Sequence, residues 1–92
     1  MQLLYFLSFG MSKLQKILSR IVTGAGVVTY PELNFVLTRF GFEEIKTGKT
    51  SGSRVAFYNR DKDIIIRLHK PHPGNDLKEY QVKMIRSFFV QN

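Results

Sequence analysis

The sequence predicts an α+β fold with the element order α-α-β-β-β-α. Two observations lead to this prediction. Apolar residues recur at helical spacing in three segments, at 12–24, 29–41 and 76–88. Strand-like patterns occur only between the second and third of these segments, at 42–46, 54–58 and 64–69. With 92 residues, the chain makes one domain that buries about 60–65% of its extended surface, so its core is thin.

The first predicted helix begins after Ser12, whose side chain can cap it, and ends at Gly24. Its apolar residues form a single stripe: Leu14, Ile17, Leu18, Ile21 and Val22. The opposite face carries the basic side chains of Lys13, Lys16 and Arg20, which we interpret as a solvated face.

The second predicted helix has the clearest local signals in the chain. Thr29 and Glu32 have the spacing of a capping box, and Pro31 is tolerated in a first helical turn. Gly41 stands where a left-handed residue ends many helices. The buried stripe of this helix consists of Leu33, Val36, Leu37 and Phe40.

A short strand is expected at 42–46, followed by a turn at 47–52 that is rich in glycine and small hydroxyl side chains. The last helix is expected to begin near Asp76, with Glu79 as its capping partner three residues later. Its apolar stripe is interrupted by one polar residue: Leu77, Tyr80, Gln81, Met84, Ile85 and Phe88.

The two strands at 54–58 and 64–69 should pair as a β-hairpin. Alternation directs one set of side chains to the core: Val55, Phe57, Ile64, Ile66 and Leu68. The other set faces outward: Arg54, Ala56, Tyr58, Ile65, Arg67 and His69. Outward residues can oppose one another only if the loop has a suitable length, and a four-residue loop at 60–63 satisfies this condition. Arg54 would then lie opposite His69, with their Cβ atoms roughly 5 Å apart.

The chain is strongly basic, with 14 Lys and Arg against 7 Asp and Glu and a net charge of +7. From position 46 onward, ten basic residues stand against four acidic ones. Such a domain attracts polyanions: nucleic acid, an anionic membrane or an acidic protein. The sequence contains no cysteine, which excludes disulfides, thiolate zinc sites and cysteine nucleophiles and fits a reducing compartment.

The first ten residues are apolar but carry no basic n-region, so a secretory signal is not expected. No apolar run approaches the ~18 residues of a transmembrane helix. We interpret 1–10 as an extension outside the shared core of the fold, arising from the choice of start site, or as a segment that packs loosely on it. Met11 would serve as a start in its own right, and 11–92 is the expected domain.

Both histidines lie in one basic segment, at His69 and His72. Histidine titrates near neutrality, so two of them beside Arg and Lys suit RNA strand cleavage without a metal. An imidazole would remove the 2′-hydroxyl proton, and cations would stabilise the charge on the phosphoryl oxygens. The alternative is a surface loop whose histidines only pack or form hydrogen bonds. A metal site lacks a third histidine, and only Asp76 is close in sequence.

Three motifs carry a resemblance to a known family. Gly-Ser-Arg-Val at 52–55, followed by His-Lys-Pro-His-Pro-Gly at 69–74 and Leu-Lys-Glu-Tyr at 77–80, resembles the HicA toxins of bacterial HicA–HicB modules, in a longer-helix branch. The resemblance implies a fold similar to a double-stranded-RNA-binding domain, with a three-stranded antiparallel sheet and helices packed on one face. It also implies cytoplasmic cleavage of messenger RNA, no cofactor, no membrane contact, and neutralisation by a HicB-like antitoxin.

Carried over residue by residue, the resemblance implies phosphate-binding residues only at Ser53, Arg54, His69, Lys70 and His72. Together with the residue chemistry, this leads us to expect His69, Arg54 and His72 as catalytic groups. The expected RNA contacts are Lys49, Ser53, Arg54, Tyr58, Arg67, Lys70 and Lys78. Many HicA toxins have a catalytic histidine where this chain has Arg54, and an arginine stays protonated and cannot act as a base. Either His69 takes that role, or the protein binds RNA without cleaving it. A third possibility is a basic domain that binds only an acidic protein.

Overall fold

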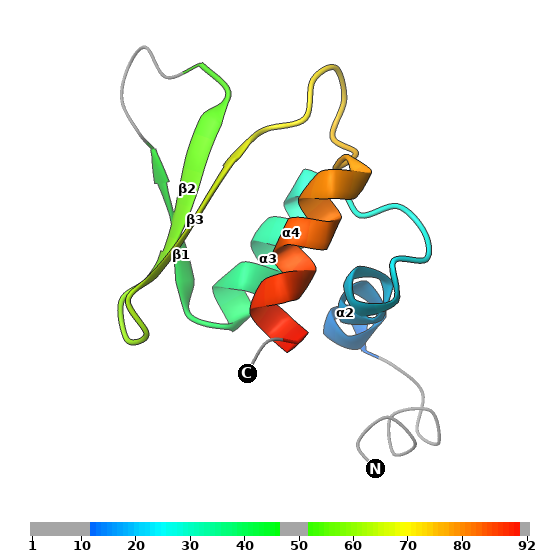
Figure 1. Ribbon diagram of the computed structural model, residues 1–92, viewed down its shortest axis with the longest axis horizontal. Coiled ribbons are helices and arrows are strands. Elements are labelled where there is room, and N and C mark those ends of the chain that lie inside the picture. Colours follow the sequence, from blue (N-terminus) through cyan, green and yellow to red (C-terminus); the bar gives the residue numbers. More distant parts are fainter. Residues whose placement is uncertain (1–11, 47–51, 91–92) are drawn as a thin grey trace.

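The computed structural model describes residues 12–46 and 52–90 and has the predicted element order (Figure 1). Its helices and strands are α2 (Lys13–Thr23), α3 (Tyr30–Arg39), β1 (Phe42–Lys46), β2 (Arg54–Asn59), β3 (Ile64–His69) and α4 (Glu79–Val90). The predicted α+β class is therefore confirmed. The expected extension at 1–10 and most of the expected turn at 47–52 lie outside the described residues. No described helix is long and apolar enough to cross a membrane.

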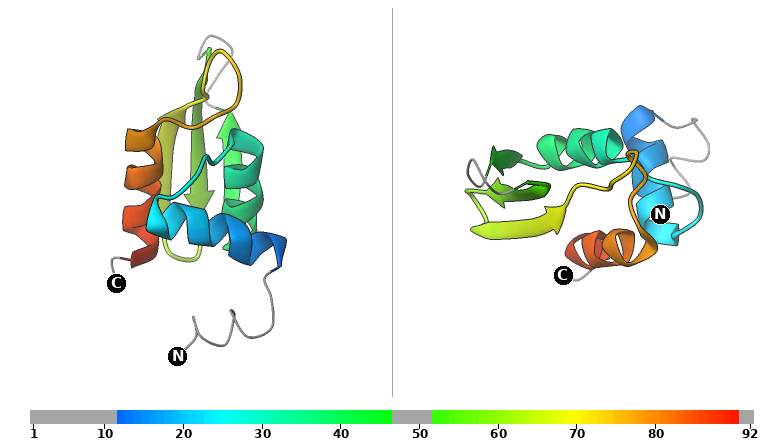
Figure 2. Two further views of the ribbon diagram at one scale, coloured as in Figure 1. Left: turned by 90° about the vertical axis from the view of Figure 1, so that its right-hand side faces the viewer. Right: turned by 90° about the horizontal axis from the view of Figure 1, so that it is seen from above.

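The elements form three layers (Figure 2). The strands make one antiparallel sheet in the order β1-β2-β3. Helices α3 and α4 lie side by side against one face of the sheet, and α2 crosses behind them on the side away from the sheet. The other face of the sheet is left open by the described helices. This agrees with the expectation of helices on one face only.

The residues predicted to start and end the first two helices do so in the structure. Ser12 forms a capping box with Gln15, and the N–H of the left-handed Gly24 donates to Arg20 at the end of α2. Thr29 and Glu32 form the predicted capping box of α3, in which each side chain accepts a hydrogen bond from the other's backbone N–H. Because these contacts span only a few residues, the sequence alone could predict them.

The start of α4 differs from the prediction. The helix begins at Glu79, not near Asp76. Asp76 instead pairs with Thr29 in an isolated antiparallel bridge, and Leu77 donates its N–H to the Val28 carbonyl, 2.9 Å away. These hydrogen bonds hold the chain extended beside the loop between α2 and α3, so it cannot turn helical until it has passed them. The capping pair of Asp76 and Glu79 is therefore wrong.

The predicted hairpin register is confirmed, with Arg54 opposite His69 and Tyr58 opposite Ile65. The loop between β2 and β3 has the predicted four residues. Ala56 lies in the outward row, yet only 2% of its surface is exposed. Its small side chain on the central strand is flanked by its longer cross-strand partners Ile45 and Arg67.

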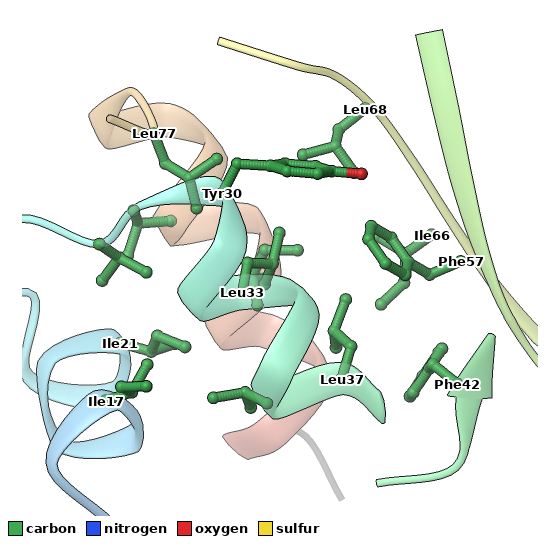
Figure 3. Close-up of a cluster of buried hydrophobic side chains, with 14 of the residues drawn as sticks. Ile17, Ile21, Tyr30, Leu33, Leu37, Phe42, Phe57, Ile66, Leu68 and Leu77 are labelled. Atoms are coloured by element: carbon green, nitrogen blue, oxygen red, sulfur yellow. The ribbon is translucent and has the colours of Figure 1, made fainter. Parts of the chain in front are cut away.

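One hydrophobic cluster fills the space between the layers (Figure 3). Phe57 of β2, at 0% exposure, packs here beside Ile66 of β3 and Leu37 of α3. Ile17 and Ile21 of α2 join the same cluster from the far side. The remaining buried members come from α3, α4, the three strands and the segments just before the two helices: Val28, Tyr30, Leu33, Val36, Phe42, Val55, Leu68, Leu77, Val82 and Ile85. The core therefore contains side chains from every described element.

Candidate functional site

The end of the hairpin that leads toward α4 brings several of the sequence-predicted residues together. Arg54 opens β2 directly opposite His69, the last residue of β3. Lys70 donates its N–H to the Ser53 carbonyl, 2.8 Å away, and so extends the pairing one step beyond the strands. Ser53, Arg54, His69 and Lys70 thus share one short piece of antiparallel backbone. His69 and Lys70 are exposed, so solvent and ligands can reach them.

Ser53 is the side-chain partner of His69. Its Oγ lies 3.3 Å from the Nδ1 of His69. When Nδ1 carries the ring proton and donates to this hydroxyl, the Nε2 atom keeps its lone pair and can accept a proton. In the opposite tautomer Nε2 is already protonated. The contact therefore links the orientation of the ring to its capacity to act as a base.

Gln81 fixes the backbone of His69 from the other side. Its side chain is buried, with 3% exposure, and its Nε2 donates to the His69 carbonyl over 2.9 Å. Its Oε1 accepts from the N–H of Lys78, also over 2.9 Å. One amide thus joins the end of β3 to the start of α4. The sequence signal for Gln81 was its position as the single polar residue in an apolar stripe.

Lys70 lies against a partly buried polar cluster. Its Nζ lies 5.3 Å from the centre of the Tyr30 ring. The Tyr30 hydroxyl donates to Glu44 over 2.8 Å, and Asn34 donates to the other oxygen of the same carboxylate over 2.8 Å. Burial and then the hydrogen bond to Glu44 raise the pKa of Tyr30, so this phenol stays protonated. The sequence analysis did not identify Tyr30 or Glu44 as part of the site.

The other predicted residues are more scattered. Tyr58 lies four residues along β2 from Arg54, about 13 Å away, and its hydroxyl donates to Asp63 over 3.0 Å. That hydrogen bond raises the pKa of Tyr58. Arg67 is exposed in the outward row, opposite Ala56.

His72 and Lys78 are exposed on the connection between β3 and α4, near the hairpin end. Lys49 lies outside the described residues. In the part of the chain that the structure describes, no three His, Cys, Asp or Glu residues are grouped so that they could hold a metal ion.

The geometry offers a solvent-accessible imidazole with an oriented ring, next to an arginine and a lysine. Such a group can take up a proton beside an anion held by cations. Among comparisons with known proteins, the family model described as HicA toxin of bacterial toxin–antitoxin matches residues 31–87. This range runs from the first turn of α3 to the last turn of α4 and includes the whole hairpin. Comparisons with curated proteins and with solved structures gave no match.

Proposed function

The chain belongs to the HicA family of bacterial toxin–antitoxin toxins, and from this premise we propose that it is a metal-independent ribonuclease that cleaves messenger RNA. The observation that carries the proposal is the pairing of Arg54 with His69 at the open end of the hairpin. The family's catalytic histidine is replaced here by Arg54, and the pairing places His69 directly beside that position, where it can act as the base.

The proposed reaction is transfer of the phosphodiester to the neighbouring 2′-oxygen. Nε2 of neutral His69 takes the 2′-hydroxyl proton, the oxygen attacks the adjacent phosphorus, and the bond from phosphorus to the 5′-oxygen breaks. The products are a 2′,3′-cyclic phosphate and a free 5′-hydroxyl. We assign to His72, the other histidine of the chain, the donation of the proton to the leaving oxygen.

Cations stabilise the charge that grows on the phosphoryl oxygens. Arg54 and Lys70 flank His69 and are assigned this role. The ring of Tyr30 supports the Lys70 ammonium and limits its freedom, which lowers the entropic cost of binding a phosphate. Ser53 is assigned as a positioning residue that holds the His69 ring through its Nδ1 atom. Lys78, Arg67, Tyr58 and Lys49 remain the proposed contacts to the rest of the RNA.

The test is RNA cleavage by the purified protein without added metal. We expect His69→Ala to lower the cleavage rate by roughly 10²–10⁴-fold, the usual contribution of a general base, with RNA affinity little changed. His72→Ala should lower the cleavage rate by a smaller factor at low pH than at neutral pH, because solvent can supply the proton at low pH. Cleavage that survives both substitutions unchanged would remove the proposed chemistry.

A non-catalytic RNA-binding module is the second candidate, and Arg54 is the observation that favours it. The resemblance leads one to expect a histidine at that position. Under this alternative the protein binds RNA with a steep salt dependence but does not cleave it. Arg54→His should then produce cleavage, whereas under the first proposal it should leave existing cleavage within about tenfold. The two outcomes separate the candidates.

The family implies a cognate antitoxin, and we propose a HicB-like protein that covers the open face of the sheet. Ile45 and Ile65 are each 40% exposed on that face, beside the charged Arg67. Glu43, which pairs with Tyr58, is exposed on the same face. An apolar patch edged by charges of both signs suits a partner that is apolar at its centre and complementary in charge at its edge. Ile65→Asp should abolish co-purification with the antitoxin, whereas Val27→Asp, at a 56% exposed position outside the sheet, should not. Co-purification that tolerates Ile65→Asp would exclude this face.

A further inference from the structure

A basic hollow lies on α4, outside the site described above. Its lining comes from one stripe along the helix: Glu79, Tyr80, Lys83 and Arg86. The hollow measures about 300 Å³ and is open to solvent. Two cations stand against one carboxylate there, so the hollow favours an anionic ligand.

Tyr80 is the most exposed of the large hydrophobic side chains in the described part of the chain, at 65%. It stands in the apolar stripe that the sequence predicts for this helix, yet the core is filled from α4 by Val82 and Ile85. Packing therefore does not account for an aromatic ring at this position. An exposed ring offers a flat surface on which a nucleobase can stack.

Arg86 is held in place beside that ring. Its Nε donates to the Ile21 carbonyl at the end of α2, over 2.9 Å. The guanidinium also lies against Gly24, where an added Cβ would come within 2.8 Å of one terminal nitrogen. These two contacts limit the movement of the Arg86 guanidinium and so of its remaining N–H groups. Lys83 adds a second cation one helical turn earlier. Fixed planar N–H groups suit phosphate oxygens.

The helix that carries the hollow is also hydrogen-bonded to the proposed cleavage site. Gln81 follows Tyr80 in the first turn of α4, and its side chain is hydrogen-bonded to the His69 carbonyl. The side of the helix that faces His69 and its solvent side are separated by about one helix diameter, roughly 10 Å. Lys78 is exposed just before the first turn of α4, in the chain between His69 and Tyr80. In the arrangement proposed below, an RNA strand bound at His69 extends past Lys78 toward the Tyr80 ring.

We propose that the α4 hollow binds a nucleotide of single-stranded RNA that flanks the cleaved bond. Its base stacks on Tyr80, and its phosphate is held by Lys83 and Arg86. The proposal rests on the proposed function only in taking RNA as the ligand. It assigns to α4 a part of the substrate footprint that lies outside the hairpin.

The test measures binding of uncleavable 2′-O-methyl oligonucleotides of increasing length by fluorescence anisotropy. Tyr80→Ala should weaken binding of the longer oligonucleotides by about 5- to 150-fold, the range for one stacked base, and leave the shortest unaffected. Tyr80→Phe keeps the ring and should bind like the wild type. Lys83→Gln should reduce the slope of log affinity against log salt by about 0.7, the value for one phosphate on a single strand.

Phe88→Ala is the matched control, because Phe88 is an exposed aromatic on the same helix that lines a different hollow. It should leave RNA affinity unchanged. If Tyr80→Ala binds every length like the wild type while the wild type binds RNA, the α4 site is overturned and the proposed function stands. If the wild type binds no RNA, both fall. Loss of antitoxin affinity alone in Tyr80→Ala would make this surface a protein contact and would equally overturn the proposal.

Discussion

At the scale of single residues, the proposed chemistry depends on how His69 is held. Ser53 contacts its ring, and Gln81 holds its carbonyl from α4. Lys70, the next residue, is fixed by a backbone hydrogen bond to Ser53 and by the ring of Tyr30. Ser53, expected from the resemblance to contact RNA, is therefore proposed also to position the imidazole.

Ser53→Ala tests this role. Loss of one hydrogen bond worth about 1 kcal/mol should lower the cleavage rate five- to tenfold, because the His69 ring is then no longer held in one orientation. The dissociation constant for uncleavable RNA should stay within twofold. Ser53→Thr keeps a hydroxyl and should retain most of the rate. The role of Ser53 is refuted if alanine changes affinity and not rate.

At the scale of elements, short polar contacts define where helices start and how they join the sheet. Asn59 at the end of β2 is 4% exposed; it donates to the Phe40 carbonyl and accepts from the N–H of Lys62, both over 3.0 Å. It thus ties the end of α3 to the hairpin loop. At the other end of α3, Glu32 caps the helix and pairs with Arg20, and so it ties α3 to α2.

Glu32→Gln tests the link between α2 and α3. The hydrogen bonds from Arg20, with those from Thr29, hold the pKa of Glu32 below its ordinary value. A carboxylate of this kind stabilises the fold above its ordinary pKa and loses that contribution as the pH falls through the folded value. The glutamine keeps the cap but not the charge. Its unfolding free energy should be about 1 kcal/mol lower at pH 7, because the pair is partly exposed.

Urea unfolding at pH 7 and at pH 3 measures the effect. The difference between wild type and Glu32→Gln should be smaller at pH 3 than at pH 7, because the lowered pKa of Glu32 makes the charge contribution fall as the carboxyl takes up its proton. A deficit of the same size at both pH values would show that the charge on Glu32 has no part in it.

At the scale of the whole molecule, α2 is the distinctive layer. The family model matches 31–87 and therefore leaves α2 out, yet Ile17 and Ile21 are each only 1% exposed in the common core. We propose that 11–92 unfolds as one domain. A chain of this length has a net stability of roughly 5–14 kcal/mol, so one large cavity consumes much of it.

Ile21→Ala tests the cooperativity of the layers. The cavity should cost about 2–5 kcal/mol, and one unfolding transition should remain, with equal midpoints by circular dichroism and tyrosine fluorescence. Val22→Ala on the same helix, at a 43% exposed position, should cost far less. Two separate transitions would mean that α2 folds independently of the sheet.

The sequence by itself determined what depends on near neighbours. Caps at Ser12 and Thr29 and the helical stripes act within one or two turns, and strand alternation with loop parity was enough to pair Arg54 with His69. Tertiary structure decided the start of α4, where a bridge between Thr29 and Asp76 keeps the chain extended. It also decided the supports of the site. Gln81 and the pair of Tyr30 with Glu44 reach the site from other elements. Such contacts form only when the layers have packed, so the spacing of residues within one helix or strand does not predict them.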